Sequence, residues 1–566
     1  MSLSLRPRLA HRVAAAARGF AALLALAATS LPAQLSLPPD YVRRQLTPAG
    51  EPDSQVTFNW RVDPRGEWVV FVGDVELAGA EAVYAIRRNG AELHRLSPYG
   101  PIGAVQSLEL SADGRFVLYR GDLATAGLDE LWSAPISGTP ASAVKINLPV
   151  IGGGVLGSTL PAAGGRIGYL AETASGTGFW SVPVAGPAAA SVRLNLDLAA
   201  DELVYGGLVV SASRIVLLIY NQTDDTVGLW SVPLAGPAAS GVYLLEASPA
   251  GCFAFLVSAS AGSNRVAYAM TCPTPVGERT NQLWSVPMAG PASESVSLAG
   301  SFVEGGAMTS YNASADGERL IFIADKLVDE TFELWSVPVA GPAGELVRLN
   351  DSLITAGDVT RFAISPDGTR VAYIADQEIN ERFSAWSVPI VGPSTHALPL
   401  VTGSFSGRDV TALAFTADSD KVVFRADLTV DNRFDLYRVP ANASAAQQLI
   451  TNDSHPPTPE RSVGSSFRLH PDGQRVVYTF DEAAPNDSRG LGEQRLSPRY
   501  TQDKRLNGVP VAGGRVSSFA IYPDNAGTLY YSDELLDGRF HLFTVDSRIF
   551  GDGFEEGTTA AWPDTP

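Results

Sequence analysis

Short apolar runs separated by turn residues recur along the whole chain, and residues 359–393 show this pattern most clearly. Val359 to Ile364 and Arg370 to Ala375 are two strand-like runs, and the sequence SPDG lies between them at residues 365–368. Proline presets φ in such a turn and glycine takes the positive-φ position. The two runs therefore predict a β-hairpin.

Two further runs extend the hairpin to four strands. Phe383 to Ile390, with Trp386 at its centre, is followed by a turn at residues 391–393 and by a run from His396 to Val401. The second run, Arg370 to Ala375, is apolar without alternation, which is typical of a strand covered on both faces of its sheet. The unit therefore predicts a four-stranded sheet that must stack against neighbouring sheets.

This unit recurs ten times. The positions equivalent to Asp367 follow one another at intervals of 48 to 54 residues, and they are Arg65, Asp113, Gly164, Ser213, Ser263, Asp316, Asp367, Asp418, Asp472 and Asp524. A large aromatic residue keeps the same period in the third run, as Tyr84, Trp132, Trp180, Trp230, Trp284, Trp335, Trp386, Tyr437 and Phe543. A period near 50 residues is typical of propeller blades. The fold class predicted is all-β, a β-propeller of about ten four-stranded blades over residues 41–548.

The two ends of the repeat array complement each other. The tenth unit has a third run, His541 to Val545, but no fourth run after it, whereas Val42 to Thr47 resembles the fourth run Ala446 to Thr451. We therefore expect the N-terminal strand to complete the last blade and to close a single ring without exposed edges. Two smaller rings are the alternative, because propellers typically have four to eight blades.

The ninth unit departs from the pattern because it lacks the aromatic residue of the third run. The polar segment Glu482 to Lys504 reads as an insertion, and it carries Arg489, Arg495 and Arg499. On an acidic chain these three residues are candidates for binding an acidic ligand or the carboxylates of neighbouring blades. The alternative is a solvated loop.

Composition and charge narrow the class of protein. The 45% apolar residues, 54 glycines and 39 prolines favour many short strands and turns over long helices or disorder. Residues 1–33 combine four arginines, an apolar run from Phe20 to Ala28 and small residues, which is typical of a signal peptide. That run is shorter than the roughly 20 residues of a membrane span. We expect an exported bacterial protein, periplasmic or extracellular, without a membrane span.

The net charge of −19 would fall to about −23 after loss of the four N-terminal arginines. Such a charge disfavours binding to nucleic acid or to an anionic membrane surface. The expected partner is another envelope or secreted protein.

The two cysteines, Cys252 and Cys272, lie on either side of a turn near Ser263, which would place them opposite each other in a hairpin. In an exported protein this arrangement predicts a disulfide. A redox or metal pair is the alternative, but two thiols alone cannot make a metal site.

An acid closes the second run of eight units, and we interpret it as a loop cap that accepts backbone N–H bonds. A ring of carboxylates that binds cations or a basic partner is the alternative. The eight residues are Asp74, Asp122, Glu172, Asp325, Asp376, Asp427, Asp481 and Asp533.

The remaining candidate chemistry is sparse. The recurring aromatic residues are expected to pack between blades, with a sugar-stacking channel as the alternative. The six histidines are scattered, and no H-E-x-x-H motif, phosphate loop or nucleotide fingerprint occurs. We therefore predict no catalytic residue, no metal ligand and no cofactor.

Three segments carry a family resemblance: SPDGTRVAYIAD at residues 365–376, SADGERLIFIAD at 314–325 and HPDGQRVVYTFD at 470–481. They resemble the Pro-Asp variant of the WD-type repeat of TolB-like propellers, which serve as periplasmic scaffolds, binding modules and caps on serine peptidases. The chain departs from TolB itself, because only about ten residues separate the signal peptide from the first strand. It also lacks the G-x-S-x-G motif of the peptidases.

The resemblance implies a protein-binding or scaffold module. A hydrolase or lyase that acts on a carbohydrate or peptide at the ring axis is the alternative. We expect the partner site on the face that carries the loops from strand two to strand three and from blade to blade, because these loops vary while the other turns are uniform. The tail, residues 549–566, lies outside the repeat and predicts no mechanism.

Overall fold

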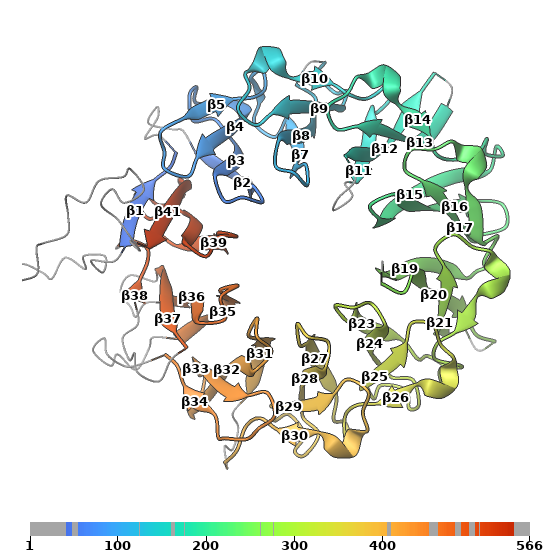
Figure 1. Ribbon diagram of the computed structural model, residues 1–566, viewed down its shortest axis with the longest axis vertical. Helices are drawn as coiled ribbons and strands as arrows, with labels where there is room; N and C mark the ends of the chain where they lie inside the picture. Colours follow the sequence, from blue (N-terminus) through green and yellow to red (C-terminus); the bar gives the residue numbers. More distant parts are fainter. Residues whose placement is uncertain are drawn as a thin grey trace, which may run out of the picture.

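The computed structural model is a single ring of ten four-stranded antiparallel blades (Figure 1), which confirms the fold class. The predicted signal peptide and C-terminal tail lie outside the part that the structure describes, and among the described residues no helix is long and apolar enough to cross a membrane. The structure describes residues 41–47, 55–123, 125–159, 165–174, 176–260, 262–275, 277–403, 409–451, 462–481, 488–496, 504–508 and 510–547.

In each blade the first strand lies nearest the centre of the ring and the fourth lies at the rim (Figure 1). Blade one comprises β2 (Val56–Val62), β3 (Trp68–Gly73), β4 (Ala80–Arg87) and β5 (Leu93–Arg95), with β6 (Gly100–Pro101) beside β4. Blade two comprises β7 (Val105–Leu110), β8 (Phe116–Gly121), β9 (Glu130–Pro135) and β10 (Val144–Lys145). Blade three comprises β11 (Val155–Thr159), β12 (Arg166–Thr173), β13 (Gly176–Pro183) and β14 (Val192–Arg193).

The next four blades continue in chain order. Blade four comprises β15 (Glu202–Ser211), β16 (Arg214–Asn221), β17 (Thr226–Pro233) and β18 (Val242–Leu245). Blade five comprises β19 (Phe253–Ser260), β20 (Arg265–Pro273), β21 (Arg279–Pro287) and β22 (Val296–Ser297). Blade six comprises β23 (Met308–Ala313), β24 (Arg319–Ala324), β25 (Glu333–Pro338) and β26 (Val347–Arg348). Blade seven comprises β27 (Val359–Ile364), β28 (Arg370–Ala375), β29 (Ser384–Pro389) and β30 (Leu398–Pro399).

The last three blades complete the ring. Blade eight comprises β31 (Val410–Phe415), β32 (Lys421–Val430), β33 (Arg433–Pro440) and β34 (Gln448–Leu449). Blade nine comprises β35 (Ser462–Leu469), β36 (Arg475–Asp481), β37 (Arg489–Arg495) and β38 (Lys504–Arg505). Blade ten comprises β39 (Val516–Ile521), β40 (Gly527–Ser532), β41 (His541–Ser547) and, as its fourth strand, β1 (Tyr41–Gln45).

The turn between β27 and β28 forms as the sequence predicts. Asp367 Oδ1 accepts hydrogen bonds from the Ser365 hydroxyl at 2.6 Å and from the Thr369 amide at 3.0 Å. Gly368 has a φ of 70°, which a residue with a Cβ rarely adopts. The first hairpin of blade seven is therefore held by its own turn side chains.

The fourth strand of blade seven is shorter than the predicted run from His396 to Val401. A 3-10 turn, η6 (Ser394–His396), occupies its beginning, and the His396 amide donates to the Pro393 carbonyl. Backbone N–H groups that are bonded within this turn cannot also pair with a neighbouring strand. Only Leu398–Pro399 therefore pairs with β29. The equivalent turns in other blades are η1 (Pro140–Ser142), η2 (Ala188–Ala190), η3 (Ala238–Ser240), η4 (Ala292–Glu294) and η5 (Ala343–Glu345).

The hydrophobic core consists of apolar layers between adjacent blades. Trp386 belongs to one such layer, where Ile321 and Leu334 of blade six pack with Val371 and Trp386 of blade seven. Trp386 is only 7% exposed. Trp386 therefore packs against the neighbouring blade, as predicted for the third-strand aromatic residues.

The N-terminal strand closes the ring. β1 pairs antiparallel with β41, with Tyr41 opposite Ser547 and Gln45 opposite Phe543. This pairing confirms the single ring and excludes two smaller rings.

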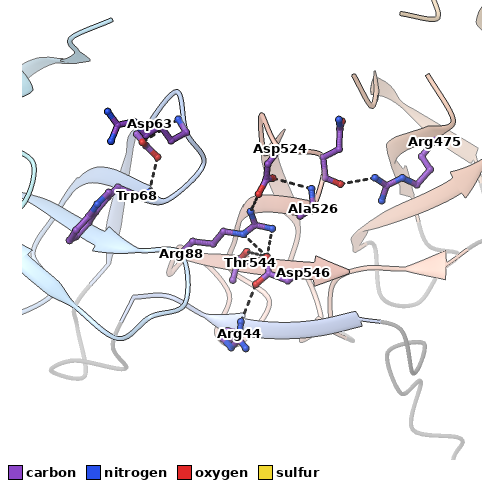
Figure 2. Close-up of polar contacts among 11 residues, drawn as sticks. Arg44, Asp63, Trp68, Arg88, Arg475, Asp524, Ala526, Thr544 and Asp546 are labelled. Carbon is purple, nitrogen blue, oxygen red and sulfur yellow. Dashed lines mark hydrogen bonds and ion pairs between the residues drawn. The ribbon is translucent and has the colours of Figure 1, made fainter. Parts of the chain in front are cut away.

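The seam between blades one and ten carries an additional ionic contact (Figure 2). Arg88, directly after β4, donates from Nε to Asp546 at 2.6 Å and forms an ion pair with Asp524 at 2.7 Å. Its guanidinium lies 3.9 Å from the centre of the Tyr522 ring. The first and last blades are thus joined by charge as well as by apolar packing.

The seam between blades nine and ten is also polar. Glu493 on β37 is buried, accepts a hydrogen bond from the Tyr41 hydroxyl and lies 3.3 Å from His470 Nε2. Burial alone would raise the pKa of Glu493, but the donors His470, Tyr41 and Arg475 outweigh it and lower that pKa. The N-terminal strand is therefore anchored to blade nine as well as to blade ten.

The prediction that Glu482 to Lys504 is an insertion is wrong for the central part of this segment. Residues 489–495 form β37, the third strand of the blade, and pair with β36 along its whole length. The strand lacks an aromatic residue because Gly492 lies under the Tyr478 ring, where an added Cβ would come within 2.9 Å of Tyr478 Cζ. Gly492 stands where the other third strands carry a large aromatic residue, so the aromatic pattern missed this strand.

We expect Trp386→Ala to destabilise the protein by roughly 3 to 5 kcal/mol, because it opens a cavity between blades six and seven. Thermal and denaturant unfolding would measure this loss. A variant that keeps its melting temperature would contradict the packing role of the aromatic series.

We expect Arg88→Ala to lower the free energy of unfolding by about 2 kcal/mol, because Asp546 and Asp524 lose a shared, largely buried cation. Arg115→Ala is the control, since Arg115 is 71% exposed and its ion pair with Asp113 is long, at 3.8 Å. Equal unfolding midpoints for the two variants would contradict a role of Arg88 in closing the ring.

Candidate functional site

The face that carries the loops from strand two to strand three and from blade to blade, here called the loop face, is held by the repeated acids. In blade seven, Asp376 Oδ1 accepts from the Asp358 amide at 2.6 Å and Oδ2 accepts from the Glu381 amide at 3.0 Å. Asp74, Asp325, Asp427 and Asp533 each accept two backbone N–H bonds in the same way. These acids act as loop caps.

The other three acids of the series differ in their contacts. Asp122 accepts one backbone bond, from Gly127 at 3.1 Å. Asp481 forms an ion pair with Arg489 at 3.1 Å. Glu172 lies beside Gly152, where an added Cβ would clash with its carboxylate.

The disulfide occupies the capping position in blade five. Cys252 and Cys272 are bonded, with their Cα atoms 4.2 Å apart. Cys252 precedes β19 and Cys272 is the penultimate residue of β20, much as Asp358 precedes β27 and Asp376 follows β28. A covalent bond therefore takes the place of the bond from carboxylate to amide.

The residues whose amides bond to the caps also connect neighbouring blades. Asp358, at the start of blade seven, accepts from the Phe332 amide of blade six at 2.8 Å, and the Val359 amide donates to the Phe332 carbonyl at 2.8 Å. Asp409 and Val410 make the same two bonds to Phe383. The loop face is therefore a connected and rigid surface in this part of the ring.

Large aliphatic side chains are exposed at the tips of these rigid loops. Each follows a capping acid and is between 44% and 59% exposed, and the residues are Leu77, Leu327, Val328, Ile379, Val430, Leu535 and Leu536. They lie on two groups of adjacent blades, six to eight and ten to one. Isolated exposed aliphatics are common, so it is the recurrence at equivalent loop positions that makes these residues a candidate surface.

Exposed acids stand beside these aliphatic residues. They are Glu76, Asp329, Glu378, Asp431 and Asp537. The sequence contains a signal for this surface, since an exposed aliphatic residue follows the capping acid by two or three positions, as in Asp376-Gln-Glu-Ile379. The sequence analysis used only the acid and did not identify the aliphatic residue as a candidate.

Of the three predicted binding arginines, Arg489 lies at the loop-face end of β37 and Arg495 at the opposite end. Arg489 and Arg495 are exposed at the two ends of β37, and Arg489 pairs with Asp481 of its own blade rather than with a neighbouring blade. Arg499 lies outside the described residues. These arginines do not form a common site in the part of the chain that the structure describes.

The histidines remain scattered in the fold. His94 lies on β5, His396 in η6, His470 before β36 and His541 on β41, and His455 lies outside the described residues. Within the described part of the chain no three His, Cys, Asp or Glu side chains could hold a metal ion together.

The opposite face, here called the turn face, carries the hairpin turns. In blade six the Ser314 hydroxyl donates to Asp316 Oδ1 at 2.5 Å and the Glu318 amide donates at 3.0 Å. These two bonds lower the pKa of Asp316 below its ordinary value. The pKa values of Asp113, Asp367 and Asp418 are lowered as well, so this face is tied by ionised carboxylates.

Comparisons with protein families and with curated proteins find no match. Similar solved structures include an oligogalacturonate lyase in complex with manganese, with 13% identity, a TM-score of 0.34 and coverage of 90% of this chain and 93% of that chain. A eukaryotic initiation factor shows 10% identity and a TM-score of 0.42 over 83% and 96% of the chains. The oligogalacturonate lyase of Vibrio parahaemolyticus shows 11% identity and a TM-score of 0.34 over 89% and 93%. These values carry no argument about function.

We expect Asp316→Asn to flatten the loss of stability at acid pH. Because folding lowers the pKa of Asp316, its contribution is complete above the unfolded value near 3.8 and is lost as the pH falls through the folded pKa. Urea unfolding between about pH 5 and pH 2 would show a shallower decline for the variant. Asp197→Asn, at a side chain that is 99% exposed, is the control. Parallel profiles for Asp316→Asn and the unsubstituted protein would contradict this assignment.

Proposed function

We propose that the protein is an exported, TolB-like propeller of Pro-Asp WD-type repeats that binds another envelope or secreted protein through its loop face. The observation that carries this proposal is the recurrence of exposed aliphatic side chains at the loop tips of blades ten, one and six to eight. Apolar side chains on a rigid scaffold are typical of a recognition surface.

The charge pattern indicates the chemistry of the partner. Each aliphatic tip is flanked by an exposed acid, such as Glu378 beside Ile379 and Asp537 beside Leu536. A complementary surface has apolar side chains surrounded by lysines or arginines. The net charge of −19 also attracts a basic partner over a distance and increases the rate of association.

The rigidity of the loops supports tight binding. Leu327 and Val328 lie in a loop whose backbone is tied at Glu330 to Asp325, and Ile379 lies in a loop tied at Glu381 to Asp376. Loops that are ordered before binding lose little conformational entropy when a partner binds.

Two observations support export. Residues 1–33 have the basic, apolar and small-residue pattern of a signal peptide. Cys252 and Cys272 form a disulfide, a bond that persists in oxidising compartments such as the periplasm and the extracellular space.

We expect serine substitutions at Leu327, Val328, Leu535 and Leu536 to reduce recovery of the partner by about tenfold or more, because truncation of apolar contacts weakens binding. The tagged protein would be used as bait in an envelope extract and in a secreted fraction, with recovered proteins quantified by mass spectrometry. All four side chains are about half exposed, so the variant should keep the melting temperature of the unsubstituted protein.

The matched control carries Val391→Ser and Val144→Ser, which remove exposed aliphatic side chains elsewhere on the molecule, Val391 on the turn face and Val144 on β10 at the rim. It should recover the partner as well as the unsubstituted protein does. Loss of the partner from the control, together with full recovery by the loop-face variant, would show that binding uses another surface.

A further inference from the structure

The first strands of the blades surround the centre of the ring (Figure 1), and seven of them have a β-bulge, at equivalent positions in six strands and two residues further along in β15. A bulge leaves one residue unpaired and changes the direction of its side chain. The bulged residues are Gln106, Leu156, Tyr205, Thr309, Thr360, Thr411 and Ser517. All except the half-buried Thr411 are exposed, although they lie on the innermost strands.

One part of this inner wall is apolar. The consecutive first strands β11, β15, β19 and β23 expose five large side chains, here called the apolar arc: Leu156, Tyr205, Leu208, Phe253 and Tyr311. Tyr205 is 63% exposed, more than any other large hydrophobic residue in the described part of the chain. Its ring meets the Phe253 ring edge to face, with the centroids 5.8 Å apart and an interplanar angle of 82°.

The rest of the inner wall is polar and includes two available cations. Arg361 on β27 and Arg468 on β35 are exposed, and their side chains make no hydrogen bond or ion pair with any described residue. Arg468 belongs to blade nine, which lies across the ring from Tyr205 on blade four (Figure 1). Two free arginines are notable on a chain with a net charge of −19.

From the apolar arc and the two arginines we infer that the inner wall binds a polypeptide segment with apolar side chains on one side and carboxylates on the other. The apolar side would pack on Tyr205, Phe253 and Tyr311, and the carboxylates would pair with Arg361 and Arg468. Exposed arginine and aromatic side chains are the residue types that dominate binding energy in protein interfaces.

The composition of the arc favours apolar side chains over sugar rings. Leu156 and Leu208 have no flat face on which a sugar could stack. Tyr205 and Phe253 meet at 82°, so their rings do not form one continuous platform. Branched and tilted apolar groups of this kind suit the irregular side chains of a polypeptide.

The dimensions of a ten-bladed ring are compatible with such a segment. Packed sheets lie about 10 Å apart, so the circle through the blade centres is about 100 Å around and about 32 Å across. Subtracting about 7 Å of strands on each side leaves on the order of 18 Å between opposite first strands. One helix is about 10 to 12 Å wide with its side chains, so a single segment can contact both parts of the wall.

The inference does not depend on the proposed function of the loop face, because none of the inner-wall residues belongs to that face. Its test is a selection of random displayed peptides on the purified full-length protein, followed by affinity measurements with the selected peptides. The selected sequences should combine aromatic or aliphatic residues with Asp and Glu.

Substitution of Tyr205 and Phe253 by serine should weaken the binding of a selected peptide by about tenfold or more, equivalent to about 1.4 kcal/mol. Arg361→Glu together with Arg468→Glu should weaken peptide binding to a similar extent. Added salt should weaken the binding of the peptide to the unsubstituted protein. All four side chains are exposed, so melting temperatures should stay unchanged.

Two controls separate this site from the loop face. Leu535→Ser with Leu536→Ser, and Arg115→Glu at a side chain 71% exposed, should both keep the affinity of the unsubstituted protein. The inference is overturned if no peptide is enriched, if basic peptides are enriched, or if the Tyr205 and Phe253 variant keeps its affinity. Loss of binding only in the Leu535 and Leu536 variant would also overturn it and would instead place peptide binding on the loop face.

Discussion

Packing between adjacent blades is the interaction on which the rest of the structure depends. Each sheet is apolar on both faces, as β28 shows with five consecutive buried residues from Val371 to Ala375, so no blade can be stable with an open side. All ten sheets are covered on both faces only when the first blade packs against the last. The pairing of β1 with β41 and the ionic contacts of Arg88 make that junction, and they join the two ends of the described chain at one seam. Closure is therefore a condition of the fold rather than an addition to it.

The loop face shows how different chemistry can serve one structural need. The end of the second strand must be tied to the residue before the first strand. Asp376 makes this tie with one backbone N–H bond, and the same carboxylate fixes the following loop through a second. Blade five makes the tie with the disulfide between Cys252 and Cys272. The repeated acids therefore stabilise the loops, and the residues between them are free to vary without loss of the fold.

This division of roles separates stability from recognition. Six of the nine aromatic residues of the third strands are buried, and five of the eight capping acids each accept two backbone N–H bonds, so these regular features offer little to a partner. The exposed residues that remain differ from blade to blade: aliphatic tips on the loop face, and aromatic or basic side chains on the first strands. Both candidate surfaces consist of positions at which the repeat is least regular.

The sequence by itself determined the period, the turns, the number of blades and the closing strand, because each depends on local patterns that recur along the chain. The turn at Asp367 and the strands β27 and β28 follow directly from that pattern. Tertiary structure alone decided that residues 489–495 form a strand, since its glycines are explained only by the rings of Tyr478 and Phe480 packed over them. It also decided that Tyr205 and Phe253, 48 positions apart, meet on the inner wall. Such contacts depend on how neighbouring strands align in space, and a bulge that redirects one side chain leaves no mark in the hydrophobic pattern.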